Sequence, residues 1–197
     1  MMSSTAPVSK DFLARVAERQ TWITPKAEIA VQDAVNGLFD KLGSAAPTVR
    51  EWLHGTPLHE PLHAVIVTVP VGSWTGAVLF DTLGAIGGSE KFDFAADALV
   101  ILGLAGAVAA SVTGMNDWSE VKREAPRKVG AVHALLNVAA SAFFIASAVQ
   151  RRKNGSRSAA RGLASVGFMV ASLSAHLGGN MIYEHGIGVE YGKRWQD

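Results

Sequence analysis

The residues of this chain best suited to chemistry are its histidines. The sequence contains six histidines and no cysteine. Thiolate metal sites, disulfides, iron–sulfur clusters held by this chain and cysteine nucleophiles are therefore excluded. A neutral imidazole is a strong ligand for haem iron and for divalent metals, and it can also carry a proton near neutral pH. Any metal chemistry would use histidine together with aspartate, glutamate or methionine.

Three of the histidines stand in long apolar segments. His63, His133 and His176 lie in or at the start of runs of about twenty residues with few charges. Ionisable groups within membrane helices usually face the interior of a bundle, which makes them candidates for function. Asn137 follows His133 by four residues and Asn180 follows His176 by four, so each amide shares the helical face of its histidine.

The apolar runs that carry these histidines are long enough to cross a membrane. At about 1.5 Å per residue, twenty residues span a hydrocarbon core of roughly 30 Å. The mean hydropathy of the chain, +0.21, is high for a soluble protein. We predict an all-α fold, an integral membrane four-helix bundle with up-down-up-down topology over residues 61–189. Its spans are predicted at residues 62–84, 95–114, 129–149 and 162–183.

The first sixty residues are predicted to form a polar, amphipathic helical segment, and residues 190–197 a polar tail. Thr24 as N-cap, Pro25 at the first helical position and Gly43 after the end define one helix over 24–42. Its apolar residues recur at spacings of three or four, so this helix could lie in the membrane interface or cover one end of the bundle. The chain start lacks the apolar core and cleavage site of a signal peptide, so we expect the first hydrophobic helix to direct insertion.

Antiparallel helices bring distant histidines to one end of the bundle. The start of the first span, the end of the second, the start of the third and the end of the fourth share one membrane side, here called side A. His63, Asp117, His133 and His176 occupy these four places. We therefore expect three imidazoles from three helices to lie near side A.

Haem binding is the first hypothesis for these histidines. A four-helix bundle can hold a porphyrin between histidines on facing helices. His63 and His133 come from the first and third spans at similar depth, so they are the predicted axial ligands of a b-type haem. Trp74 falls within about 20° of His63 on a helical wheel. Together with Asn137 and Asn180 it is expected to line the site.

Two other hypotheses remain open from the residues. A divalent metal or a proton could be bound by His63, His133 and His176 together with Glu60 or Asp117. Alternatively, each histidine only forms hydrogen bonds to water, a backbone carbonyl or a lipid headgroup.

Acidic and basic residues also gather at the opposite end, side B. Asp81 and Asp97 face a segment that contains Arg151, Arg152, Arg157 and Arg161. We interpret this arrangement as structural ion pairing, with an ion path as the alternative. The formal net charge of +1 argues against nucleic-acid binding, which needs a basic surface.

Five segments of the chain resemble a known family when they are taken in order. They are LHGTPLHEPLHAVIVTVPVGSW from Leu53, FDTLG from Phe80, TGMNDW from Thr113, VGAVHALLN from Val129 and HLGGNMIYEHGIGV from His176. Together they resemble the bacterial membrane family catalogued as domain of unknown function 2231, over about residues 53–189. The resemblance implies a four-helix domain in the bacterial inner membrane. Because many relatives are joined to a Rieske iron–sulfur domain, it also implies electron transfer, although no activity is established.

The family pattern is kept at His63 and His133, and it differs at two other places. Relatives commonly have histidine where this chain has Glu60 and Asn180. If those histidines form a second ligand pair in relatives, this chain retains only the pair of His63 and His133. No Rieske domain follows in this chain, so an iron–sulfur partner is expected to be a separate protein. The other positions that keep the pattern are Pro70, Asp81, Gly114, Asp117, Asn137, Gly178, Gly179 and Gly186.

The favoured hypothesis is therefore a multi-pass inner-membrane protein that binds haem b and serves as an electron-transfer subunit rather than a stand-alone enzyme. One alternative is a membrane scaffold or accessory subunit, and another is a small metal or proton transporter. The expected partners are the lipid bilayer and a redox protein, and small residues on the helices would allow a homo-oligomer.

Overall fold

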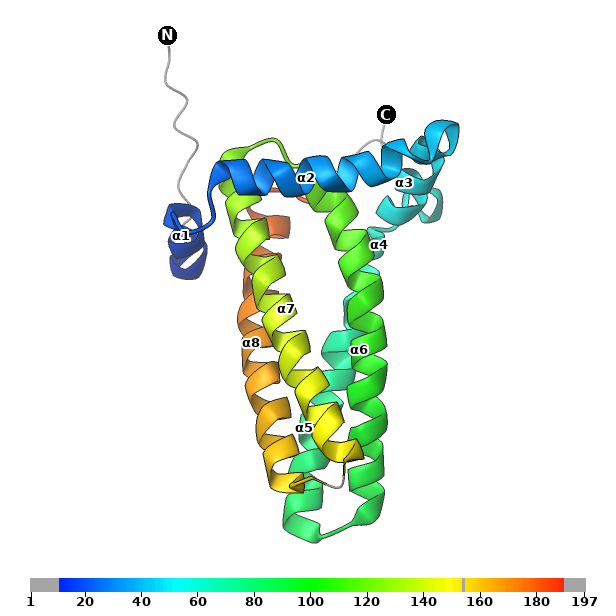
Figure 1. Ribbon diagram of the computed structural model, residues 1–197, viewed down its shortest axis with the longest axis vertical. Helices are drawn as coiled ribbons and strands as arrows, with labels where there is room; N and C mark the ends of the chain where they lie inside the picture. Colours follow the sequence, from blue (N-terminus) through cyan, green and yellow to red (C-terminus); the bar gives the residue numbers. More distant parts are fainter. Residues whose placement is uncertain (1–10, 154, 190–197) are drawn as a thin grey trace.

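The fold is a bundle of four long helices with three shorter helices at one end (Figure 1). The structure is a computed structural model that describes residues 11–153 and 155–189; the first ten residues and the predicted tail, 190–197, lie outside this part. The bundle helices are α4 (Leu62–Ile66) with α5 (Thr68–Gly87), α6 (Glu90–Ser119), α7 (Glu124–Arg152) and α8 (Arg157–Tyr183). Before them come α1 (Phe12–Arg19), α2 (Pro25–Asp40), α3 (Ala46–His54) and two short 3-10 turns, Gly43–Ala45 and Thr56–Leu58.

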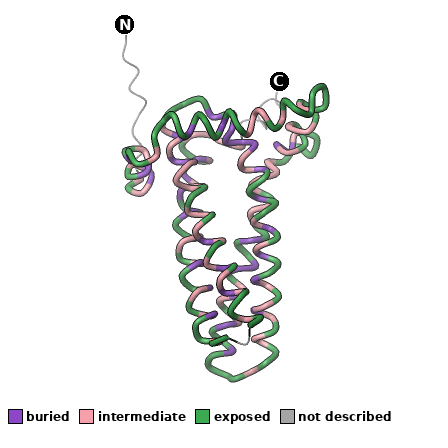
Figure 2. Tube along the Cα trace, in the orientation of Figure 1, coloured by how far each residue is buried: buried purple, intermediate pink, exposed green. Residues whose placement is uncertain are grey.

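The four predicted spans are confirmed as helices long and apolar enough to cross a membrane. They run over Leu62–Gly87, Glu90–Ser119, Glu124–Arg152 and Arg157–Tyr183. All are longer than the hydropathy pattern predicts, because their polar ends continue the helix beyond the apolar core. The outward sides of the bundle are largely exposed and apolar, as a lipid-facing surface requires (Figure 2).

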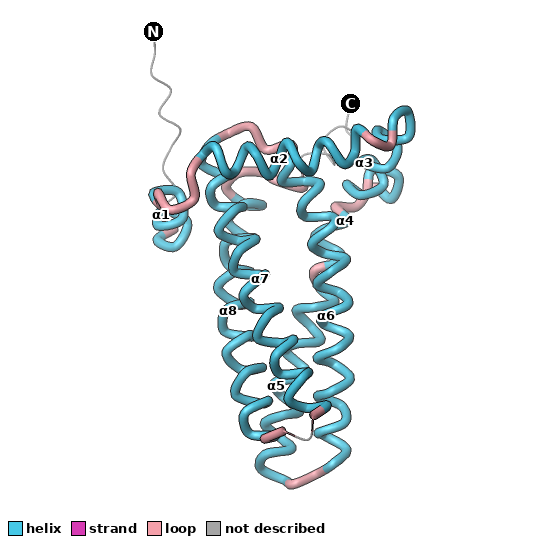
Figure 3. Tube along the Cα trace, in the orientation of Figure 1, coloured by secondary structure: helices cyan, strands magenta, loops and turns pink. Residues whose placement is uncertain are grey.

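The predicted all-α class and up-down topology are also confirmed. Short loops join successive helices, and no strand occurs among the described residues (Figure 3). Helix α5 packs along α6 and α7 along α8, while fewer contacts join α6 to α7 and α5 to α8. The four helices thus form a ring of two hairpins, with α5 and α7 on one diagonal.

The two hairpins repeat one another, which the sequence analysis did not predict. Trp74 of α5 packs against Gly103 of α6, and Phe144 of α7 packs against Gly167 of α8. The rings of Trp74 and Phe144 stack across the diagonal at 4.2 Å between centroids. The repeat extends along the core of α6 and α8, where buried residues sixty-four positions apart correspond. They are Ala96, Val100, Gly103 and Ala110 in α6, and Ala160, Ala164, Gly167 and Ser174 in α8.

Helix α2 lies across the side-A end of the bundle (Figure 1). Of the two alternatives for residues 24–42, it therefore covers the bundle end, but it does so with polar side chains. Glu28 and Gln32 are buried, whereas Val31 and Leu38 are exposed. The Gln32 amide donates to the carbonyls of Trp118 and Val121 at 2.8 and 3.0 Å. Polar side chains suit this position because the last carbonyl groups of a helix have no hydrogen-bond donor within the helix.

Candidate functional site

His63 lies at the side-A end of the first hairpin, directly after Pro61 starts α4. Its Nδ1 lies 3.0 Å from the carbonyl of Ala110 and 3.2 Å from the hydroxyl of Thr113, both in α6. The ring rests on Gly114, where an added Cβ would come within 2.7 Å of the imidazole. Glycine therefore permits the close contact between His63 and α6.

His133 has the same surroundings in the second hairpin. Its Nδ1 lies 2.8 Å from the carbonyl of Ser174 in α8 and 3.0 Å from the hydroxyl of the same residue. The ring rests on Gly178, where a Cβ would come within 3.0 Å of it. In both hairpins the accepting carbonyl precedes the glycine by four residues.

The repeat places the two histidines at equivalent positions. His63 precedes Trp74 by eleven residues, and His133 precedes Phe144 by eleven. Eleven residues are close to three helical turns, so each histidine shares the inward face of its stacked ring. The structure thus brings His63 and His133 to the same end of the bundle, each against the second helix of its own hairpin. The helix is interrupted at Val67, between α4 and α5, three residues before Pro70, whose ring disfavours the regular helical path there.

The hydrogen bonds assign the same tautomer to both rings. A backbone carbonyl can only accept, so Nδ1 of each neutral imidazole carries the proton and Nε2 keeps its lone pair. In His133 this lone pair accepts from the amide of Asn137 at 3.0 Å. Asn137 is thus brought to its histidine as expected, and its counterpart in the first hairpin is Val67. An imidazole fixed through Nδ1 with Nε2 available is the usual form of a metal-ligating histidine.

Comparison with known families covers both hairpins. Residues 59–191 match the family described as predicted membrane protein, DUF2231. The chain belongs to this family. No curated protein and no solved structure matches the chain. The match confirms the resemblance noted from the five segments, and it includes His63 and His133 but not helices α1 to α3.

His176 does not join the other two histidines of the DUF2231 domain. Its side chain is 52% exposed on the outside of α8, and its Nε2 lies 2.7 Å from Asp11 Oδ2. Trp74 is buried where it stacks on Phe144, three helical turns along the bundle from His63. Asn180 is buried in α8. The rotation of α8 about its axis, which depends on packing, decides that His176 faces outward.

Asp117 pairs with a histidine that the sequence analysis left outside the site. His54 of α3 contacts Asp117 through Nδ1 and Oδ1 at 2.6 Å, and both side chains are buried. Burial lowers the pKa of His54, but hydrogen bonds to Asp117 and Glu120 outweigh it and raise the pKa to about 9. One sequence feature could have indicated this pair: His54 stands only a short distance before the start of the first span.

The positions of His176 and Asp117 bear on the hypothesis of a divalent metal site. His176 faces away and pairs with Asp11, and the Asp117 carboxylate is engaged by His54. Among residues 11–153 and 155–189, no group of three or more His, Asp or Glu side chains is placed to hold a metal ion. A three-histidine metal site is therefore not supported by this geometry.

The predicted ion pairing at side B of the DUF2231 domain is confirmed. Arg151 binds Asp81 and reaches Asp97 at 2.6 Å, and Arg157 also lies 2.6 Å from Asp97. Arg161 lies 2.7 Å from Asp93, a partner that was not predicted. Asp81 and Arg151 are equivalent in the repeat, so an acid in one hairpin faces a base in the other. These ion pairs join the first hairpin to the second at side B, as the structural interpretation predicts.

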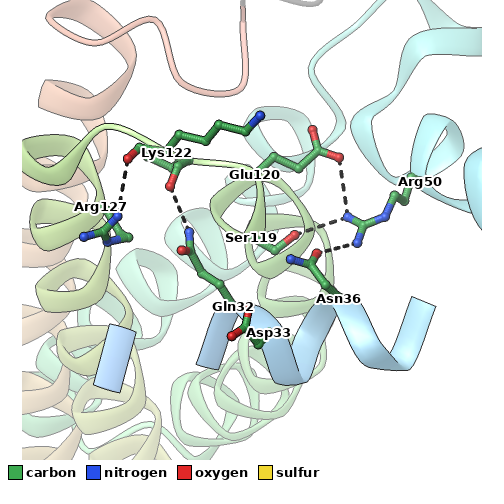
Figure 4. A pocket seen from close by; sticks show the side chains of 9 residues that line it. Gln32, Asp33, Asn36, Arg50, Ser119, Glu120, Lys122 and Arg127 are labelled. Atoms are coloured by element: carbon green, nitrogen blue, oxygen red, sulfur yellow. Dashed lines mark hydrogen bonds and ion pairs between the residues drawn. The ribbon is translucent and has the colours of Figure 1, made fainter. Parts of the chain in front are cut away.

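A polar pocket lies under α2, separate from the histidine pair (Figure 4). Its volume is about 720 Å³. Arg50 points into it and is held by Asn36 at 2.6 Å, Asn116 at 3.1 Å and Ser119 at 3.2 Å. The lining residues are Gln32, Asp33, Asn36, Arg50, Ser119, Glu120, Val121, Lys122 and Arg127. Because the arginine is already satisfied by protein groups, it serves to attach α3 to the bundle.

Proposed function

We propose that this DUF2231 protein binds a b-type haem in the membrane, with His63 and His133 as its two axial ligands. The observation that supports the proposal is the matched attachment of the two imidazoles. Each donates from Nδ1 to a carbonyl of its hairpin partner, Ala110 at 3.0 Å and Ser174 at 2.8 Å. This contact orients the ring and raises the basicity of Nε2, which is the ligating nitrogen.

The repeat gives the two ligands a common geometry. A planar porphyrin with two axial histidines needs one imidazole on each face, and two equivalent hairpins can supply them. The Trp74–Phe144 stack lies about 16 Å further along the bundle, at 1.5 Å per residue, so these two rings do not occupy the histidine end. Asn137 would release Nε2 of His133 when the iron binds.

Haem supplies a one-electron redox centre when it is bound. The residues of this chain would hold it and tune it, Thr113 and Ser174 through their hydroxyl groups near Nδ1 of each ligand. Because both histidines lie at side A, electrons would enter and leave at that end, to or from a separate redox protein. An iron–sulfur protein is the class of partner, and the bacterial inner membrane the location, that the family resemblance favours.

The visible spectrum of the full chain tests the proposal. The protein is expressed with added haem precursor, purified in detergent and reduced with dithionite. We expect a Soret band and the sharp α and β bands of six-coordinate low-spin haem. Replacement of His63→Ala or His133→Ala should remove these bands or convert them to a five-coordinate form.

A matched control separates ligation from folding. His176→Ala changes the same residue type on the same bundle but outside the pair, so its haem content should equal that of the wild type. Helix content from circular dichroism confirms that each variant is folded. A folded wild-type protein that stays colourless with haem supplied, or equal haem content in all three variants, would overturn the proposal and favour an accessory role.

A further inference from the structure

Helix α1 lies beside the bundle rather than across its end. It contacts α7 and α8, and Figure 1 shows it at their flank while α2 crosses the bundle end. Asp11, the N-cap of α1, contacts His176, which precedes the end of α8 at Tyr183 by seven residues. Seven residues correspond to about 10 Å along a helix. Helix α1 therefore meets α8 within its candidate membrane span, Arg157–Tyr183.

The inner face of α1 is firmly packed. Ala14 and Ala17 are buried in one cluster with Leu177 and Met181 of α8. The contact of Asp11 with His176 holds the start of the helix, and Gln20 is buried at its end. This attachment fixes which face of α1 points outward.

The outward face of α1 is apolar and exposed. Phe12 and Val16 lie four residues apart on one side and are 67% and 54% exposed, and Trp22 just beyond the helix is 66% exposed. Met169 stands two turns from His176 on the same face of α8 and is 66% exposed. The apolar surface of α1 therefore continues the lipid-facing surface of α8 at the point where the two helices meet.

We propose that α1 is an interfacial helix that inserts Phe12 and Val16, together with Trp22, into the lipid leaflet at side A. Arg19, in the last turn of α1, is exposed on the same side as Phe12 and Val16, so its long side chain can reach lipid phosphates while its stem lies against the apolar strip. The occupant of this face is the bilayer itself, because lipid already surrounds the adjoining face of α8. The inference is independent of haem binding.

Single labels on the full-length protein test this placement, since the chain has no cysteine to replace. Phe12→Cys and Val16→Cys each receive an environment-sensitive fluorophore. The protein is reconstituted in vesicles of phosphatidylcholine and phosphatidylglycerol. Quenching by spin-labelled lipid is then compared with quenching by aqueous iodide. Met169→Cys provides the lipid reference and Asp40→Cys, exposed at the end of α2, the water reference.

We expect the labels at residues 12 and 16 to follow the label at residue 169, with lipid quenching several-fold above that at residue 40 and little iodide quenching. Iodide quenching equal to that at residue 40 would overturn the proposal, because the face would then lie in water. Protection from both quenchers would also overturn it, because protein rather than lipid would cover α1. All four positions are on the surface, so the labels should leave the fold intact.

Discussion

The indole ring of Trp74 and the phenyl ring of Phe144 stack across the bundle diagonal at 4.2 Å, with their planes 9° apart. Each ring comes from the first helix of its hairpin and rests on a glycine of the second, Gly103 or Gly167. The pair therefore joins equivalent positions of the two hairpins. Along the helices from this pair, His63 and His133 take equivalent positions on one side, and Asp81 and Arg151 on the other.

The glycine under Trp74 provides a prediction about packing. A Cβ at Gly103 would overlap the indole, so Gly103→Ala should reduce the free energy of unfolding by about 1–3 kcal/mol. In α8, Gly162 has no atom within 4 Å of the Cβ position, so Gly162→Ala should be neutral or stabilise by up to about 1 kcal/mol. Thermal unfolding in detergent measures both; equal effects would contradict the packing of Trp74 on α6.

The glycines that contact the two histidine rings give a prediction about haem binding. Ala at Gly114 or Gly178 would push the ring of His63 or His133 away from its carbonyl. We expect both variants to bind less haem than the wild type, measured as haem per chain by the pyridine haemochromogen method. Gly72→Ala, with open space at the Cβ position, is the control and should retain the haem content of the wild type. Full haem content in the first two variants would show that the present ring positions are not needed.

The His54–Asp117 pair predicts a pH dependence of stability. The pKa of His54 is raised from 6.5 to about 9 in the folded protein, so protonated His54 stabilises the fold. This contribution is fully present below about pH 6.5, decreases as the pH rises, and is lost above about pH 9. Its size is on the order of 3 kcal/mol. The difference in Tm between the wild type and His54→Gln should therefore be largest at low pH; a difference independent of pH would contradict the ion pair.

Breaking the ion pairs at side B should destabilise the fold. Arg151→Gln removes the closest cationic partner of buried Asp81 and leaves it Arg157 at 3.3 Å and Arg161 at 3.8 Å, so we expect a loss of up to about 3 kcal/mol in the free energy of unfolding. Adding Asp81→Asn should recover part of this loss because the less fully compensated charge is removed. A double-mutant cycle measures the coupling, and strictly additive losses would show that the two residues act independently.

The sequence pattern predicts which helices carry the site and at which end of the bundle it lies, but not the contacts within it. Hydropathy and alternation predicted four spans and a common end for His63 and His133, because both follow from chain length and connectivity. The hairpin repeat stayed hidden because few residues are identical in its two halves and the two loops differ in length. Only the spacing within each helix recurs, eleven residues between histidine and aromatic ring and eleven between the two glycines. Asp93 was missed among the side-B ion pairs because it lies near a helix start, where an acidic residue already has a local reason to occur.

By itself the sequence determined that this chain is a four-helix membrane protein of the DUF2231 family, because twenty apolar residues and five ordered segments need no tertiary information. Only the tertiary structure decided which face each helix turns inward. That rotation gives His133 a carbonyl of α8 and sends His176 outward to Asp11. It also pairs Asp117 with His54. The physical reason is that a helix can turn about its axis without changing its hydropathy, so its rotation is set by the glycines, rings and ion pairs of the neighbouring helices.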